Sequence, residues 1–168
     1  MPAREVGWFN AVDLQSVAVK KDGTIIVGDV KRMVLTEHSP TDGSLKRTKP
    51  VKTKPYFLAT DSVDRVIIAG SSQEVDVASL NGGKLFVIKP TIQGRAVKYC
   101  NGVYTDSSGI YVAVHGDGDT GHIHQYDTQG VFLSCIAQGL HSPRGITVTA
   151  DGHLAVVDRY SVETYHKV

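Results

Sequence analysis

The chain has 168 residues, with 18 lysines and arginines against 17 aspartates and glutamates, and it has two cysteines. This length supports one well-buried core and excludes two large domains. No run of 18 apolar residues occurs, which excludes a membrane-spanning helix, and the near-neutral charge lacks the basic excess of an obligate nucleic-acid binder.

The first strand pattern is Ser16–Asp29, where an Asp-Gly pair separates two runs rich in β-branched residues. Asp-Gly favours a tight hairpin turn because glycine adopts a positive φ at no steric cost, and β-branched side chains suit strands. The same order recurs around 56–70, 102–114 and 143–158, with steps of 41, 45 and 43 residues between the last turn residues. These last turn residues are Gly23, Asp64, Gly109 and Gly152.

A period of about 40 to 45 residues with four strands per unit is typical of propeller blades. The sequence therefore predicts an all-β fold, a single four-bladed β-propeller domain over residues 1–168. The expected blades cover about 14–50, 55–90, 101–139 and 143–168, the last one completed by residues 4–12.

The two ends of the chain are expected to close the propeller ring. The last unit stops after a third strand, Ser161–Tyr165, while residues 4–12 belong to no three-strand unit. We expect the N-terminal segment to supply the missing outer strand, because an open ring would leave two exposed sheet edges. The alternative is a four-blade fragment of a six-bladed propeller that assembles with a second copy. Lys46–Pro55, basic and with two prolines, predicts an edge strand followed by a connector.

The last repeat carries a family resemblance. Pro143, Gly145 and the segment Asp151-Gly152-x-Leu154-x-Val156-x-Asp158 resemble an NHL repeat, most of all those in the C-terminal propellers of tripartite-motif (TRIM-NHL) ubiquitin ligases. The resemblance implies a non-catalytic module that recognises a protein partner or substrate. We expect a cytoplasmic location, because two cysteines outside any Cys-x-x-Cys spacing suit a reducing compartment. The catalytic parts would lie elsewhere, since two cysteines cannot build the zinc sites of a RING finger. An upstream coiled coil of the full-length protein could make it oligomeric.

One face of the predicted propeller is the expected partner-binding surface, because the loops that join the second to the third strand and one blade to the next share that face. It gathers basic and aromatic side chains. Arginine and tyrosine anchors suit a protein partner, whereas cations beside stacking rings suit single-stranded RNA as the alternative ligand. The residues are Lys31, Arg32, Lys54, Arg95, Lys98, Tyr99, Arg144, Arg159 and Tyr160.

Candidates for catalysis and metal binding are weaker. Neither Gly-x-Ser-x-Gly nor a phosphate-binding glycine loop occurs, so we expect no catalytic residue and no cofactor, with a calcium-dependent propeller hydrolase as a remote alternative. His122 and His124 share one strand face near Asp117 and Asp119, which offer oxygen ligands. The segment lacks an EF-hand pattern or a zinc spacing, so we expect a flexible connector without metal. Two buried, reduced thiols are expected at the cysteines, positions 100 and 135.

Overall fold

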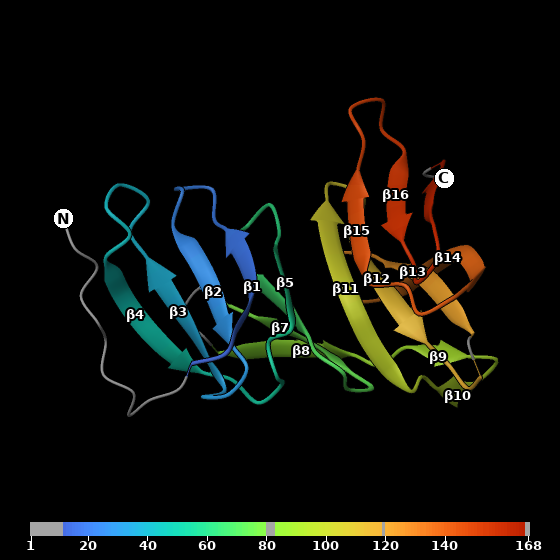
Figure 1. Cartoon of the computed structure of the whole chain (residues 1–168), viewed down its shortest axis with the longest axis horizontal. Helices are drawn as coiled ribbons and strands as arrows, with labels where there is room; N and C mark the ends of the chain where they lie inside the picture. Colours follow the sequence, from blue (N-terminus) through green and yellow to red (C-terminus); the bar gives the residue numbers. More distant parts are fainter. Residues whose placement is uncertain (1–11, 80–82, 119, 167–168) are drawn as a thin grey trace.

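The computed structural model describes residues 12–79, 83–118 and 120–166. Over these residues the protein is all-β, without a helix, and its four blades are arranged as a β-propeller (Figure 1). The fold class and the four blades predicted from the sequence are thus confirmed. Within the described ranges, no helix has the length and apolar character needed to span a membrane.

Each blade is an antiparallel meander whose strands follow one another in chain order. Blade one consists of β1 (Leu14–Val19), β2 (Ile25–Asp29), β3 (Val34–His38) and β4 (Leu45–Pro50). Blade two consists of β5 (Phe57–Thr60), β6 (Val66–Ala69), β7 (Val75–Ala78) and β8 (Lys84–Ile88). Blade three consists of β11 (Tyr99–Asp106), β12 (Gly109–His115), β13 (Gly121–Tyr126) and β14 (Phe132–Leu140). Blade four has β15 (Gly145–Val148), β16 (Leu154–Val157) and β17 (Val162–Tyr165).

The turn between the first two strands of each blade has a residue with positive φ at the same place. Gly23, Asp64, Gly109 and Gly152 have φ values of 82°, 61°, 133° and 86°. These are the left-handed conformations that the predicted turns require. The periodic turn signal in the sequence therefore marks the real corner of each blade.

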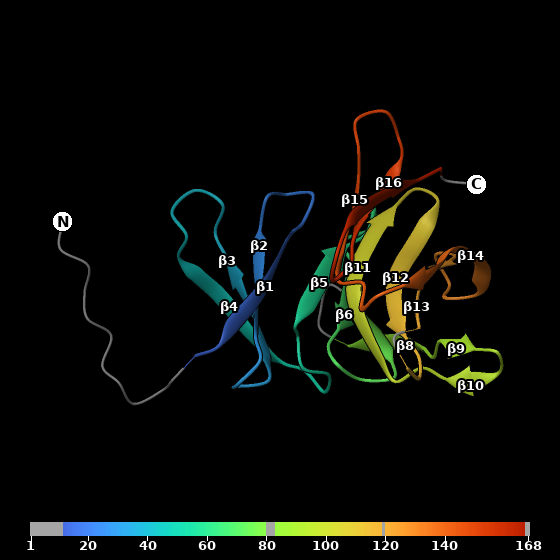
Figure 2. The same ribbon diagram turned by 45° about the vertical axis from the view of Figure 1, so that its right-hand side comes forward.

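The structure adds a hairpin that the sequence analysis did not predict. Strands β9 (Thr91–Ile92) and β10 (Arg95–Ala96) pair in the connection between blades two and three, and they project beside blade three in Figure 2. Gln93 and Gly94, the two turn residues, both have positive φ, 51° and 76°, as a type I′ turn demands. Gln93 stands at the first turn position, where asparagine or aspartate is usual, and this hid the signal.

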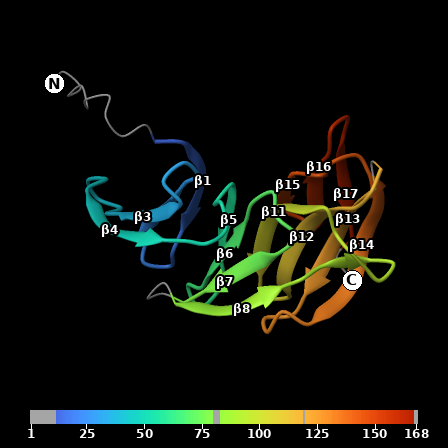
Figure 3. The same ribbon diagram turned by 90° about the horizontal axis from the view of Figure 1, so that it is seen from below.

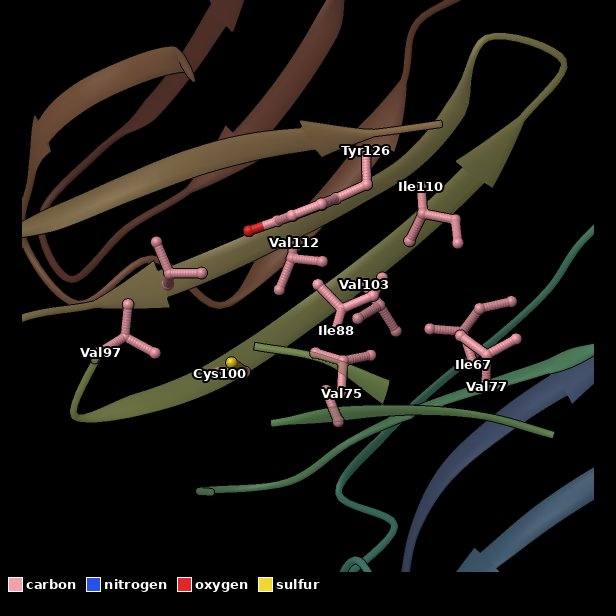
Figure 4. Close-up of a cluster of buried hydrophobic side chains, with 12 residues drawn as sticks. Ile67, Val75, Val77, Ile88, Val97, Cys100, Val103, Ile110, Val112 and Tyr126 are labelled. Atoms are coloured by element: carbon pink, nitrogen blue, oxygen red, sulfur yellow. The ribbon is translucent and has the colours of Figure 1, made fainter. Parts of the chain in front are cut away.

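The blades are held together by apolar side chains at each interface. The largest cluster lies between blades two and three and includes Ile67, Val77 and Val112, which point toward one another in Figure 4. Strand β12 is buried along its whole length. Smaller clusters join blade one to blade two around Ile26, and blade three to blade four around Leu154.

The innermost strands β1, β5, β11 and β15 gather on the inner side of the arc of blades (Figure 3). All four line one hollow of about 450 Å³. The predicted closing strand, residues 4–12, lies outside the described residues except for Val12, and the described part of blade four has three strands. Closure by that segment, like the six-bladed alternative, stays a prediction.

Candidate functional site

The main candidate site is a polar depression at the entry ends of the inner strands, here called the axial pocket. It consists of two adjoining hollows of about 620 and 600 Å³ that share Tyr99 and Arg144. Loops of the predicted face build it together with the first residues of strands β1 and β11. Its lining residues are Gln15, Tyr56, Phe57, Ser71, Tyr99, Asn101, His115, Ser142, Arg144, Val157, Asp158 and Arg159.

Arg144 reaches the pocket because the segment before β15 crosses closely over β11. A Cβ atom on Gly102 would lie 1.6 Å from the carbonyl oxygen of Arg144, so this crossing requires glycine. The buried side chain of Asn101 donates a hydrogen bond to the carbonyl of Pro143 (3.0 Å), and the Arg144 amide donates to the carbonyl of Val157 (2.9 Å). The backbone on both sides of Arg144 is therefore fixed, while its side chain remains exposed.

His115 and Tyr99 form the most enclosed part of the pocket wall. They are paired across strands β11 and β12, and their rings stack with centroids 4.5 Å apart and planes 10° apart. His115 is only 5% exposed. Its carbonyl accepts a hydrogen bond from the Lys98 amide (2.6 Å). A histidine in the wall of a cavity is a candidate for proton transfer, and the stack on Tyr99 holds its ring in place.

The carboxylate of Asp158 holds the loops that line the pocket. It accepts hydrogen bonds from the amides of His141 (3.0 Å), Tyr160 (2.8 Å) and Ser161 (2.8 Å). These amides, led by that of His141, lower the pKa of Asp158 to about 2. Asp29 holds the matching turn of blade one in the same way.

Calcium does not fit the axial pocket. Among the described residues that line it, Asp158 is the one carboxylate, and its oxygens are already occupied by amide donors. A calcium ion takes six to eight oxygen ligands, usually with several carboxylates.

The predicted partner-binding residues separate into groups. Tyr99, Arg144 and Arg159 line the axial pocket, whereas Arg95 lines a distinct pocket of about 210 Å³ with His122. Lys31, Lys54 and Lys98 are exposed, Arg32 pairs with Asp29, and Tyr160 packs against His141 and Arg159.

Sequence reasoning missed the neutral lining of the axial pocket, because it searched the loops for charges and aromatic rings. Asn101 and His115 lie inside strands β11 and β12, at the ends nearest the pocket. A polar residue at the end of an otherwise apolar strand was the signal that could have identified them.

A second cluster lies on blade three. His122, His124 and Cys135 each direct one ligand atom into a region where these atoms lie within 4.8 Å of one another; it is the one such group of three in the described part of the chain. Burial, and then the neighbouring His122, lower the pKa of His124 to about 4, so its imidazole is neutral at pH 7. Asp117 is exposed and outside the cluster, and Asp119 lies outside the described residues.

The two cysteines differ, which corrects the expectation that both thiols are buried. Cys100 is fully buried, and burial, with a smaller contribution from Glu74, raises its pKa to about 12. Cys135 is exposed because it lies on β14, the outer strand of blade three. Neither cysteine forms a disulfide.

No protein-family model and no curated protein sequence matches the chain. Solved structures are similar to it. A gluconolactonase from Xanthomonas campestris aligns with a TM-score of 0.75 at 14% identity, over 94% of this chain and 61% of that one. Streptogramin B lyase aligns with a TM-score of 0.67 at 17% identity, over 92% and 54%. Glutaminyl cyclase from Myxococcus xanthus aligns with a TM-score of 0.65 at 9% identity, over 94% and 74%.

At these identities the similarity shows the fold, a β-propeller. The chain spans between about half and three quarters of the length of these proteins. All three are named as enzymes, and no family model supports the TRIM-NHL assignment. The expectation of a non-catalytic TRIM-NHL recognition module is therefore wrong. The lack of nucleophile signatures in the sequence did not exclude an enzyme, because general acid–base catalysis needs no such signature.

Proposed function

We propose that the chain is the substrate-binding part of a hydrolase-like propeller enzyme that acts at the axial pocket. The observation that carries the proposal is the buried His115, stacked on Tyr99 in the wall of a pocket that also presents Arg144. The enzyme names of the structural neighbours support it. The chain spans only part of the length of these neighbours. The activity of the whole protein is therefore also a proposal.

The pocket suits a small, oxygen-rich substrate. Hollows of about 600 Å³ are of the size that binds small molecules. The Arg144 guanidinium binds a carboxylate or polarises a carbonyl oxygen, since it presents several fixed donors. His115 moves a proton to or from the reacting group, and the Tyr99 hydroxyl offers a hydrogen bond. We therefore propose esters or lactones as the substrate class.

The test is hydrolysis of a panel of aryl esters and δ-lactones, with and without a carboxylate substituent. Removing a general acid–base group typically costs about 10²- to 10⁴-fold in rate, so His115→Gln should lower kcat by at least about 10²-fold. Arg144→Gln should raise KM for the carboxylate-bearing substrates alone where the guanidinium binds their carboxylate, and lower kcat for all substrates where it polarises the reacting carbonyl. Arg95→Gln is the matched control, because Arg95 lines the separate pocket. Equal kcat values for wild type and a folded His115→Gln variant would reject the proposal.

We further infer that blade four is an NHL-type repeat. The support is the spacing of Pro143, Gly145 and Asp151–Asp158. Pro143 lies in the segment before β15, Gly145 is the first residue of β15, and Asp151–Asp158 covers the turn and second strand of the β15–β16 hairpin. This inference concerns the repeat type alone.

A further inference from the structure

Strands β13 and β14 bring three metal-ligating side chains to one face of blade three. His122 and His124 are two positions apart on β13 and therefore project from the same face. Cys135 lies directly opposite His124 on β14. The Sγ atom of Cys135 is 3.8 Å from Nδ1 of His122.

His124 is held by its surroundings in the way that metal-ligating histidines are. Its Nδ1 atom lies 3.2 Å from the hydroxyl of Tyr126, and its ring packs edge-on against Phe132, with centroids 5.3 Å apart. A hydrogen bond at one ring nitrogen fixes the imidazole and directs the other nitrogen outward. His124 is 3% exposed, so this orientation is enforced by packing.

We propose that His122, His124 and Cys135 bind a zinc ion, with the fourth coordination position left open. Imidazole nitrogens and a thiolate sulfur are donors that zinc binds, whereas calcium and magnesium require oxygen. The thiol of Cys135 gives its proton to solvent on binding. This site is separate from the axial pocket and does not depend on the proposed hydrolase activity.

The geometry needs only a small adjustment to reach coordination. Zinc–nitrogen and zinc–sulfur bonds of about 2.0 to 2.3 Å place tetrahedral ligand atoms roughly 3.3 to 3.8 Å apart. The ligand atoms now lie within 4.8 Å of one another, and Cys135 Sγ and His122 Nδ1 are already 3.8 Å apart.

The fourth coordination position of the zinc ion would hold a ligand that exchanges with solvent. His122 also lines the pocket of about 210 Å³ beneath the β9–β10 hairpin, together with Arg95 and Asp117. Water can therefore approach the ion from that side. Three protein ligands with an open fourth position are typical of zinc sites that exchange their ligand, whereas structural sites are closed by four.

The test is titration of the chain with Co²⁺ as a spectroscopic probe, followed by Zn²⁺ competition. We expect one equivalent of Co²⁺ to give a thiolate-to-cobalt charge-transfer band that Zn²⁺ abolishes. Cys135→Ser should lose the band, and so should His122→Asn, a half-buried position whose replacement leaves the core intact. Zn²⁺ should also raise the Tm of the wild type and not of Cys135→Ser.

Two controls address the other donors in the chain. Cys100→Ala removes the buried thiol. His153→Asn disrupts the exposed pair formed by His153 and His166, whose ring nitrogens lie 2.9 Å apart. Both variants should keep the band. Absence of the band in wild type, its survival in Cys135→Ser, or its loss in His153→Asn would overturn the proposal. His115→Gln should keep the band, which separates this result from the test of the hydrolase.

Discussion

The third strands of blades one and three occupy the same place in their blades. Each carries a buried polar residue, and the two residues are stabilised in different ways. Glu37 on β3 and His124 on β13 are both buried, 4% and 3% exposed. Each faces a partner on the outer strand of its blade, Arg47 on β4 and Cys135 on β14.

In blade one the buried group is a charge that the chain itself neutralises. Glu37 accepts hydrogen bonds from the ammonium groups of Lys20 (2.9 Å) and Lys49 (2.8 Å), while Arg47 approaches to 3.6 Å. In blade three the set consists of neutral imidazoles and a thiol. A buried charge must be paired with an opposite charge. Neutral imidazole and thiol groups can lie side by side without such a partner, and their lone pairs stay available to a cation. The difference shows why blade three, and not blade one, offers a metal site.

The largest expected effect comes from breaking the charge balance of blade one. Glu37→Gln leaves Lys20, 7% exposed, without its main counter-charge, which typically costs about 3–5 kcal/mol of unfolding free energy. His124→Gln in blade three removes a neutral hydrogen bond to Tyr126 and a ring contact with Phe132, and it should cost about 1–3 kcal/mol. Urea unfolding of the two variants measures both values.

The control for this pair is a double variant, Glu37→Leu with Lys20→Met, which replaces both buried partners by apolar groups. It should recover most of the stability lost in Glu37→Gln. Equal losses in Glu37→Gln and His124→Gln would contradict the distinction between the two blades.

Acid should weaken the Glu37 cluster of blade one. Burial raises the pKa of Glu37, but the hydrogen bonds from Lys49 and Lys20 and their charges outweigh burial, so its pKa lies below the ordinary 4.5. A carboxylate with a lowered pKa stabilises the folded state above the pKa of the unfolded chain. That stabilisation is lost as the pH falls from 4.5 through the lower, folded value.

Unfolding free energies of wild type and of the Glu37→Leu, Lys20→Met variant, measured between pH 7 and about pH 3, check this expectation. Other carboxylates with lowered pKa, such as Asp29 and Asp158, act in the same direction in both proteins. The unfolding free energy of wild type minus that of the variant therefore isolates Glu37, and this value should decrease as the pH falls. A constant difference would refute the assignment.

The smallest effect is expected at the rim of the same cluster. The Arg47 side chain is 53% exposed, and its nitrogen lies 3.6 Å from Glu37, so Arg47→Ala should cost about 0.2–1 kcal/mol at low salt. The loss should shrink as salt rises, because exposed pairs are screened. A cost as large as that of Glu37→Gln in the same urea assay would show that Arg47, and not Lys20, balances the charge.

The sequence by itself determined the repeat. Turn residues such as Gly23 and Gly152 fix positive φ values, and the β-branched runs between them fix the strands, because both are local properties of the backbone. From these the four blades and the shared loop face could be predicted. Arg144 and Arg159 were predicted in the same way, as exposed side chains in predictable loops, and Tyr99 as a ring beside such a loop.

Tertiary structure alone decided which residues meet. A bulge opposite Gln125 and Tyr126 shifts the β13–β14 register so that His124 faces Cys135, whereas unbroken pairing from Tyr126 and Phe132 would place Ser134 there. His115 joins the axial pocket because its ring stacks on a residue sixteen positions earlier. Register shifts and close crossings, such as that of Arg144 over Gly102, depend on packing between strands and leave no periodic trace in the chain.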